Sequence, residues 1–490
     1  MNGKLQGIII CAVVLVCLGG MLLFLNLTGK DNNDNSSAEE SSAINSQVDE
    51  SVLLVDSSSD KILTVKATNA QGGFTIEKPE SGKVSWNVPE LNGLNQSLKA
   101  EKSLVENVAQ LEAEKLVEEN AENLDKYGLK NPQAEFTVTF SDDSTRTFFV
   151  GDVTPEKTKY RYLTEKDTNT VYTVLSTKIE EFLDGKEQFI ETLLIESPEE
   201  IEFGTLTIKR PDIDYEMKFV QDTAEDNDMM SAQIMTSPIY SYLNGSTSQD
   251  ITHGLWGLTA ETAVCLFPEN SDKEEYGINK PTATVVYEGK GESYILYIGN
   301  PEYSKNSEGE DNATVAYYYC YVEGVDGIDC IWKIPSESLP WATVMPQDII
   351  TTIMTYNNIV KIESFTVEAD GEKTVYAVEA DKETETVTAV KIDGKETDVD
   401  SFKTFYQYFL SCPTTEIWYT EPEGESFMTI SIDAGENKDT LEFFYDSSSA
   451  RKAIVKRNGQ TSFRIPLDWT EKFAGNMEAL EKGEEVLASY

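Results

Sequence analysis

A six-residue motif occurs twice in this chain, and the repetition constrains the fold more than any other feature. The first copy reads Tyr127-Gly-Leu-Lys-Asn-Pro132 and the second reads Tyr276-Gly-Ile-Asn-Lys-Pro281. Each copy is followed by an alternating strand pattern, a glycine after an apolar run, and a tyrosine-rich hairpin pattern. Because internal repeats at a long period indicate arrays of one unit, the sequence predicts tandem copies of a single domain.

The motif predicts a structural role more strongly than a binding role. Glycine adopts positive φ cheaply, proline stiffens the entry to a strand, and tyrosine can pack its ring while its hydroxyl reaches the rim. The residues assigned to this structural repeat motif are Tyr127, Gly128, Pro132, Gly151, Tyr276, Gly277, Pro281 and Gly299.

Periodicity within each copy mixes helix and strand. Ser97 to Glu112 has helical spacing of apolar residues, and Phe136 to Phe140 alternates as a half-buried strand does. We therefore expect an α+β fold, with tandem repeats of an antiparallel-sheet-plus-helix unit behind one N-terminal transmembrane helix. The third copy is degenerate, since Thr420 to Gly424 replaces the Tyr-Gly-Leu loop.

The predicted segment boundaries of the chain follow from the repeat and from its composition. They are a transmembrane signal anchor at 1–30, a disordered acidic Ser/Asn-rich stalk at 31–60, repeat unit 1 at 61–197, repeat unit 2 at 198–346, and the degenerate repeat unit 3 with a short tail at 347–490.

An apolar segment near the amino terminus predicts attachment to a membrane. Residues 5–27 contain no charged side chain and are long enough to span hydrocarbon as a helix. A cleaved signal peptide would have a shorter apolar core followed by a small-x-small site, and neither is present. Lys4 precedes the segment and Asp31 follows it, so we expect a single-pass protein of the cell membrane with a cytoplasmic amino terminus and an extracytoplasmic bulk.

The charge balance excludes one large class of partner. The chain has 40 Lys and Arg against 86 Asp and Glu, which gives a formal net charge of −46. Such a surface repels phosphate backbones, so nucleic-acid binding is not expected. Solubility is the simpler explanation of the charge, and a cationic ligand is the alternative.

The sequence carries none of the common motifs for catalysis, metal binding or cofactor binding. His253 is the single histidine, and one imidazole cannot form the usual zinc-protease site. The sequence has no Cys-x-x-Cys and no phosphate-binding Gly-x4-Gly-Lys-Ser/Thr loop. We therefore expect no enzyme, no cofactor and no metal site, with a hydrolase using an unrecognised acidic site as the alternative.

Two further features leave alternatives open. Cys320 and Cys330 could form a disulfide across a hairpin, or could be two free buried thiols. Tyr317, Tyr319 and Tyr321 share one face of a strand, which could be a ligand or partner face or could be covered by the fold itself.

The chain resembles a bacterial family of unknown function that occurs as tandem repeats in membrane-anchored proteins. The resemblance rests on the two Tyr-Gly-Leu/Ile-x-x-Pro motifs, the strands that lead to Val150-Gly151 and Ile298-Gly299, and the Val171-Tyr-x-Val ending. Genes of that family often lie beside those of gliding-motility-type ABC transporters. The resemblance therefore implies a non-catalytic extracytoplasmic accessory or scaffold protein whose partners are an ABC permease and ATPase. The alternative is a cell-surface binder of wall polysaccharide or peptide that uses its aromatic strands.

Overall fold

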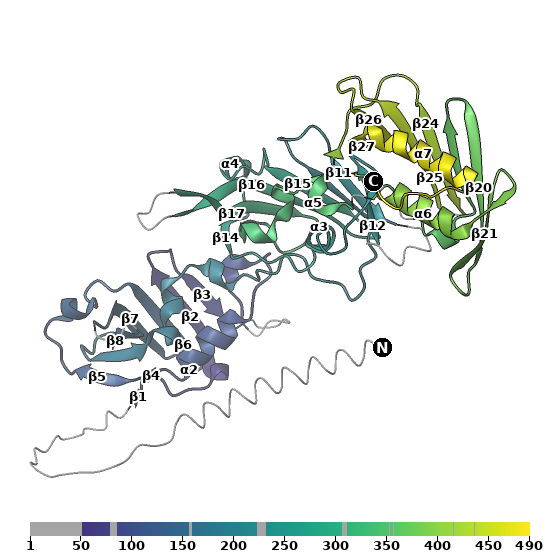
Figure 1. Ribbon diagram of the computed structural model, residues 1–490. Coiled ribbons are helices and arrows are strands. Elements are labelled where there is room, and N and C mark those ends of the chain that lie inside the picture. The colour runs from purple at the N-terminus through teal and green to yellow at the C-terminus, as the bar shows by residue number, and fades with distance from the viewer. Residues whose placement is uncertain are drawn as a thin grey trace, which may run out of the picture. The chain divides into compact units, whose positions relative to one another are not determined.

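The computed structural model describes residues 51–490 apart from residues 79–85, 156–158, 223–231, 306–310, 352, 356, 415 and 436 (Figure 1). The apolar segment at residues 5–27, the rest of the expected anchor, and residues 31–50 of the expected stalk lie outside the described residues. Within the described ranges, no helix is both long enough and apolar enough to cross a membrane.

The expected α+β fold is wrong, because strands dominate: 41% of the residues are strand and 21% are helix. The pattern at 97–112 forms only a π-helical segment, η3 (Ala100–Val105), and one turn of helix, α2 (Glu106–Ala109). Two longer helices occur late in the chain, α6 (Val399–Leu410) and α7 (Leu467–Lys482). The remaining helical elements are short: α3 (Gln249–His253), α4 (Asn270–Glu275), α5 (Pro346–Ile349), η1 (Ser59–Lys61), η2 (Pro89–Leu91), η4 (Leu124–Tyr127), η5 (Ser176–Lys178), η6 (Glu180–Leu183), η7 (Lys186–Phe189), η8 (Ser336–Ser338), η9 (Pro340–Ala342) and η10 (Ile359–Lys361).

Residues 51–60 are ordered, although the composition predicted the end of a stalk. Strand β1 (Val52–Leu53) pairs antiparallel with β4 (Glu112–Ala113), and Val55 is 2% exposed. Val55 is buried and Leu54 packs partly against the core, while Val52 and Leu53 stay exposed and pair with β4. The burial of Val55 and Leu54 helps to offset the entropy of ordering this segment.

Three large antiparallel sheets follow (Figure 1). The first has the order β3 (Phe74–Glu77), β2 (Ile62–Asn69), β6 (Ala134–Phe140), β7 (Thr145–Val153), β8 (Tyr160–Glu165), β9 (Val171–Leu175), β5 (Lys115–Glu118). The second has the order β13 (Ser241–Tyr242), β12 (Gln233–Ser237), β11 (Met217–Gln221), β10 (Thr205–Lys209), β15 (Ala283–Glu288), β16 (Ser293–Lys305), β17 (Asp311–Glu323), β18 (Cys330–Pro335), β14 (Thr262–Leu266). The third has the order β22 (Lys395–Thr397), β21 (Thr386–Ile392), β20 (Glu372–Asp381), β19 (Ser364–Ala369), β24 (Met428–Ala434), β25 (Asn437–Tyr445), β26 (Lys452–Arg457), β27 (Gln460–Pro466), β23 (Glu416–Ile417).

The three sheets share one topology. In each, an amino-terminal run of antiparallel strands, two in the first sheet and four in the other two, pairs through its first strand with a four-stranded meander, and a short strand made before the meander closes the far edge. The third sheet keeps this order although its sequence lacks the Tyr-Gly-Leu loop. The strand order therefore repeats more completely than the sequence motif does.

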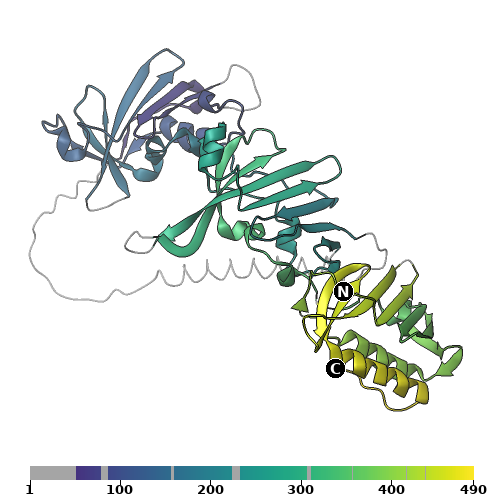
Figure 2. The same cartoon turned by 90° about the horizontal axis from the view of Figure 1, so that it is seen from above.

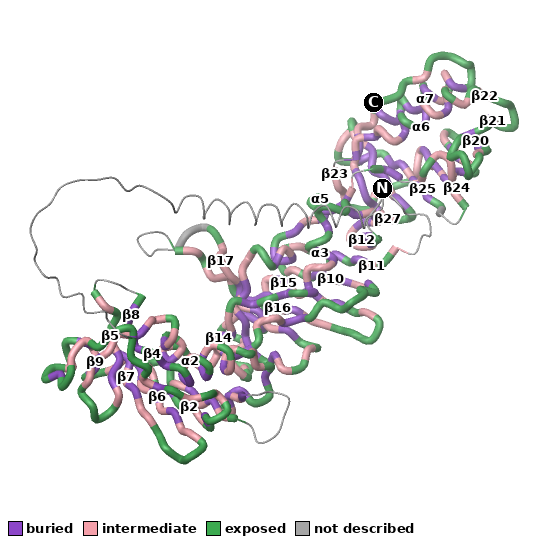
Figure 3. The backbone as a smooth tube through the Cα atoms, turned by 90° about the horizontal axis from the view of Figure 1, so that it is seen from below, coloured by how far each residue is buried: buried purple, intermediate pink, exposed green. Residues whose placement is uncertain are grey.

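The buried side chains form two large clusters (Figure 3). One cluster contains residues from Val55 to Ile350 and includes both the first and the second sheet, while Ala121, Tyr127, Leu129 and Val171 form a small separate cluster. The other runs from Met354 to Leu480 within the third sheet and its helices. Figure 2 shows α6 and α7 side by side on one face of the third sheet, where Phe405 and Phe473 pack with ring centroids 5.1 Å apart.

A buried ionic cluster holds the segment that leads into the third sheet. The Asp439 carboxylate accepts hydrogen bonds from the Thr355 hydroxyl, from Asn357 at 3.1 Å, and from Arg457 and Asn458 at 3.0 Å each. Burial alone would raise the pKa of Asp439, but the Arg457 charge and these hydrogen bonds hold it below its ordinary value.

The same arginine also touches the second sheet. Arg457 is fully buried, and its guanidinium carbon lies 5.4 Å from the ring centre of Tyr240 and 5.2 Å from that of Tyr242. Cation–π contact of this kind is strongest where water is excluded.

Candidate functional site

The motif glycines adopt the backbone conformation that the sequence predicts. Gly128 has φ of +67° and Gly277 has φ of +78°, both in the left-handed region. An added Cβ would lie 2.5 Å from the Asp152 carboxyl carbon at the first and 2.3 Å from Asn300 Oδ1 at the second. The two loops therefore make equivalent turns against equivalent neighbours.

Gly151 in β7 and Gly299 in β16 cannot accept a side chain because of close contacts, and not because of their φ. An added Cβ at Gly151 would lie 2.3 Å from the backbone oxygen of Tyr127, and at Gly299 it would lie 2.3 Å from that of Tyr276. Each loop thus rests directly on the second strand after it, which is β7 in the first unit and β16 in the second.

The motif tyrosines also occupy matching positions. The Tyr127 ring lies 4.8 Å from Tyr162 at 64°, and the Tyr276 ring lies 4.8 Å from Tyr319 at 62°. The Tyr127 hydroxyl donates to Glu118 at 2.5 Å, and this bond together with burial raises the pKa of the tyrosine. With Pro132 just before β6 and Pro281 just before β15, the geometry favours a structural role for the motif.

The tyrosine row, which comprises Tyr317, Tyr319 and Tyr321, lies on the outer face of β17 and is half-buried. The alternate residues Tyr318 and Cys320 point into the core, with exposed fractions of 7% and 0%. This is the alternation that the strand pattern predicts.

Charged side chains of the protein itself cover the tyrosine row. The Tyr319 hydroxyl donates to Glu302 at 2.7 Å and the Tyr321 hydroxyl donates to Asp329 at 2.9 Å. The Lys273 ammonium lies 3.7 Å from the ring centre of Tyr321.

Lys333 adds a further contact to the tyrosine row. Its ammonium lies 4.2 Å from the ring centre of Tyr317 and 2.9 Å from Glu302. Lysine ammonium groups already lie over two of the three rings. The tyrosine row is therefore engaged in internal contacts more than it is available to bind a ligand.

Cys320 and Cys330 are free thiols, so the disulfide alternative is not realised. The pairing of β17 with β18 places Cys320 opposite Trp332, and the pairing of β14 with β18 places Cys330 opposite Leu266. Burial raises the pKa of the Cys330 thiol to about 12, which keeps it protonated and poorly nucleophilic.

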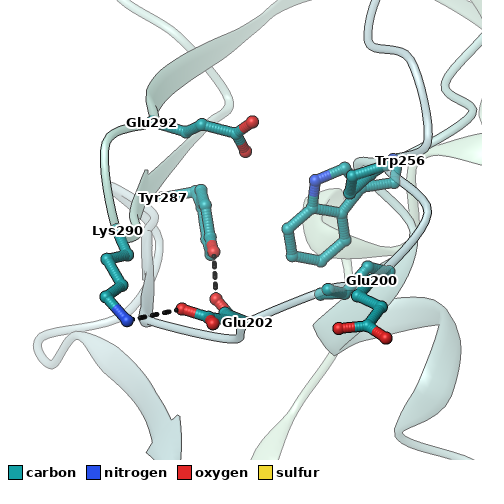
Figure 4. A pocket seen from close by; sticks show the side chains of 8 residues that line it. Glu200, Glu202, Trp256, Tyr287, Lys290 and Glu292 are labelled. Carbon is teal, nitrogen blue, oxygen red and sulfur yellow. Dashed lines mark hydrogen bonds and ion pairs between the residues drawn. The ribbon is translucent and has the colours of Figure 1, made fainter.

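A pocket that the sequence did not indicate lies beside the second sheet (Figure 4). It has a volume of about 210 Å³. Three segments form it: the chain before β10, the loop after α3, and the turn between β15 and β16. Its lining residues are Pro198, Glu200, Ile201, Glu202, Trp256, Tyr287, Lys290 and Glu292.

Two aromatic side chains form the inner wall of the pocket. Trp256 and Tyr287 are 8% and 2% exposed, and their ring centroids lie 4.9 Å apart at 80°. The Tyr287 hydroxyl donates to the Glu202 carbonyl at 3.2 Å and accepts from the Gly204 amide at 3.3 Å. Trp256 Nε1 is buried, and no described residue accepts a hydrogen bond from it.

Charged residues form the rim. Lys290 forms an ion pair with Glu202 at 3.0 Å; Glu200 lies in the same segment as Glu202, and Glu292 lies in the same turn as Lys290 (Figure 4). His253, at the end of α3, packs 5.8 Å from the Trp256 ring, and burial lowers its pKa. Neutral and packed among aromatic rings, His253 lies behind the pocket wall and is not one of its lining residues.

Among the described residues, no three His, Cys, Asp or Glu side chains are grouped so that they could hold a metal ion. No curated protein and no solved structure matches the chain. The family models do give a match, which begins at Trp86 in the first sheet unit and ends at Pro281, the last residue of the second motif. Residues 86–281 match the model of the family described as "Domain of unknown function (DUF4340)".

Proposed function

We propose that this chain is a non-catalytic, membrane-anchored accessory protein, held at the membrane by residues 5–27, whose extracytoplasmic part associates with an ABC transporter complex made of a permease and an ATPase. The observation that supports the proposal is the threefold use of one sheet topology after an uncharged apolar segment. Repeated units present similar surfaces in series, which suits the binding of other proteins. The link to a transporter comes from the resemblance of the Tyr-Gly-Leu-x-x-Pro segments.

Membrane attachment is tested with the full-length chain. Leu15→Arg places a charge in the middle of the apolar segment, which raises the free energy of insertion by about 2.5–3.5 kcal/mol. We expect this variant to leave the membrane fraction after cell lysis. Leu98→Arg is the matched control, because Leu98 is 60% exposed in the folded part. Retention of Leu15→Arg in membranes would contradict the anchor.

The partner is tested by crosslinking in cells, followed by detergent capture of the tagged full-length chain and mass spectrometry. We expect enrichment of a transporter permease and ATPase over an unrelated anchored protein. Capture of wall polysaccharide without those proteins would instead favour the cell-surface binder, and capture of neither would contradict the transporter association.

A further inference from the structure

Residues 484–490, which we call the strap, fold back along α7. The helix ends at Gly483, which has φ of +68°, and the strap then returns toward the start of the helix (Figure 1). Leu487 bonds to Asn476, and Tyr490 bonds to Asp468, eight helical residues nearer the start. Those eight residues span about 12 Å, which the three residues from Leu487 to Tyr490 cover only when the chain is nearly extended. The strap therefore lies on α7 as a bound peptide would.

One buried side chain of α7 bonds to the backbone of the strap. Asn476 is 3% exposed. Its amide group donates to the Leu487 carbonyl at 3.1 Å and accepts from the Leu487 N–H at 3.0 Å, so it pairs with this residue as a neighbouring strand would. A buried amide that loses both partners loses free energy, so this side chain requires a peptide backbone at the same place.

A second set of contacts surrounds a tyrosine at the other end of the strap. The Tyr490 hydroxyl donates to Asp468 at 2.6 Å, and the Tyr490 backbone N–H donates to Ser411 Oγ, at the end of α6, at 2.9 Å. The Lys472 ammonium lies 4.6 Å from the ring centre of Tyr490. Because an acceptor and a cation both meet one phenol ring, this place favours tyrosine. We call Ser411, Asp468, Lys472 and Asn476 the strap site.

The strap itself buries little apolar surface. Leu487 and Tyr490 are 55% and 42% exposed, and Val486 is half-buried. Segments with few buried apolar contacts and exposed hydrogen bonds open locally at less free energy than the core requires. Local opening of the strap leaves α6 and α7 folded and the strap site free.

The charge around the end of α7 disfavours the strap. The carbonyl end of a helix carries partial negative charge, which attracts cations and repels anions. Glu484 and Glu485 begin the strap at this end, and Glu478 and Glu481 lie close by in the helix. Lys482 is the basic residue of the last turn, and it is already paired with Glu478. A segment with basic residues in place of the two strap glutamates therefore fits this place better than the strap does.

We propose that the strap site binds an extended segment of a partner protein, in which basic residues precede an apolar residue and a tyrosine follows four positions later, and that the strap blocks the site until such a segment displaces it. The backbone of that segment bonds to Asn476, its tyrosine reaches Asp468 and Lys472, and its basic residues lie at the acidic end of α7. A second copy of this chain is a poor occupant, since two chains with a formal net charge of −46 repel each other. The proposal does not rest on the transporter association, and each can fail alone.

The test uses the folded full-length chain in detergent and three fluorescent peptides with blocked ends, whose binding is measured by anisotropy at low salt. The strap peptide has the sequence of residues 484–490, the lysine peptide adds Glu484→Lys and Glu485→Lys, and the proline peptide adds Leu487→Pro to the lysine peptide. Proline removes the N–H that donates to Asn476. We expect the lysine peptide to bind about tenfold more tightly than either of the other two.

The same proline in the chain loosens the strap. Leu487→Pro in the full-length protein should raise its affinity for the lysine peptide about tenfold, because the strap then occupies its site for less of the time. Leu487→Ala keeps the N–H and is the matched control, and it should leave the affinity unchanged because the Leu487 side chain is exposed. Both substitutions lie in an exposed segment outside the core, so neither should unfold the third unit.

Hydrogen exchange measures the opening itself. The Leu487 amide of the unchanged chain should exchange faster than amides in the middle of α7, such as that of Phe473. Exchange of both amides at one rate would mean that the strap opens only when the whole unit unfolds, which would overturn the proposal.

Three binding results would also overturn it. Failure of the lysine peptide to bind the Leu487→Pro chain would mean that the strap site holds no peptide but its own. Equal binding of the lysine and proline peptides would remove the role of Asn476. Dimers of the unchanged chain that the lysine peptide dissociates would assign the strap site to a second copy of this chain.

Discussion

Gly151 and Gly299 are the residues at which the repeat has least freedom to change. At Gly299 an added Cβ would meet two backbone oxygens, that of Tyr276 at 2.3 Å and that of Tyr319 at 2.9 Å. Backbone atoms of a loop and of a central strand cannot both move aside. The glycine is thus required by packing and not by its own φ.

Gly299→Ala is therefore expected to lower the free energy of unfolding by about 1–3 kcal/mol, the usual effect of overpacking. The measurement is the midpoint of urea unfolding followed by circular dichroism. Gly475→Ala is the matched control, because an added Cβ there meets nothing within 4 Å and the residue lies in α7. The control should gain about 0.5–1 kcal/mol from helix propensity. Equal midpoints for Gly299→Ala and the unchanged chain would contradict the packing argument.

At the residue scale, some features could be predicted from the sequence and others could not. Positive φ at Gly128 and Gly277 follows from the sequence, because the loop chemistry is local. The pocket could not be predicted, since Glu202 and Tyr287 meet only when β10 pairs with β15 across some 80 residues of chain. Nothing local in the sequence marks Trp256 as a pocket residue.

At the scale of elements, the packing of β17 is stabilised by the hydroxyl groups of its tyrosines, which make their hydrogen bonds only while they are protonated. The hydrogen bond to Glu302, burial, and the charge of Glu302 together raise the pKa of Tyr319 to about 12 from an ordinary value of 10.0. A pKa raised on folding means that the neutral form is stabilised in the folded state. This contribution is complete below pH 10.0 and is lost as pH rises toward about 12.

We therefore expect the unfolding midpoint of the unchanged chain to fall as pH rises through this window. Tyr319→Phe should be less stable at neutral pH and should show a smaller further loss at alkaline pH. The measurement is a set of urea midpoints across the window, with Tyr445→Phe as the control because Tyr445 is 62% exposed. Parallel pH profiles for Tyr319→Phe and the unchanged chain would show that the hydroxyl does not contribute.

The elements also show where sequence patterns mislead. Alternation on β17 was predictable, since a strand with one buried face has period two. Helical spacing at 97–112 produced only short π and α segments, because the chain must turn at Gln110 and Leu111 to deliver β4 (Glu112–Ala113) to β1. Tertiary pairing overrode the local preference there.

At the scale of the whole molecule, the two hydrophobic clusters predict two unfolding transitions. One cluster joins the first two sheets, and the other belongs to the third. Phe136 and Phe405 are both fully buried, one in each cluster. Phe136→Ala and Phe405→Ala should each remove about 3–5 kcal/mol from the cooperative unit that contains it.

Differential scanning calorimetry distinguishes the outcomes. Phe136→Ala should shift one transition and Phe405→Ala the other, with each variant serving as the control for the other. A single transition that both variants move equally would mean that contacts such as those of Arg457 with Tyr240 and Tyr242 join the two clusters into one cooperative unit.

The closing strand of each sheet has a consequence for how the chain must be made. Strands β5, β14 and β23 are synthesised before the meander, yet each pairs with the last strand of that meander, β9, β18 or β27. The backbone of each short strand therefore stays unpaired until the rest of its unit has been synthesised. Pairings of this kind form slowly and leave partly folded chains open to aggregation. Because the chain is made from its amino terminus, its units would be completed one after another, and it would be most vulnerable just before each final strand is made.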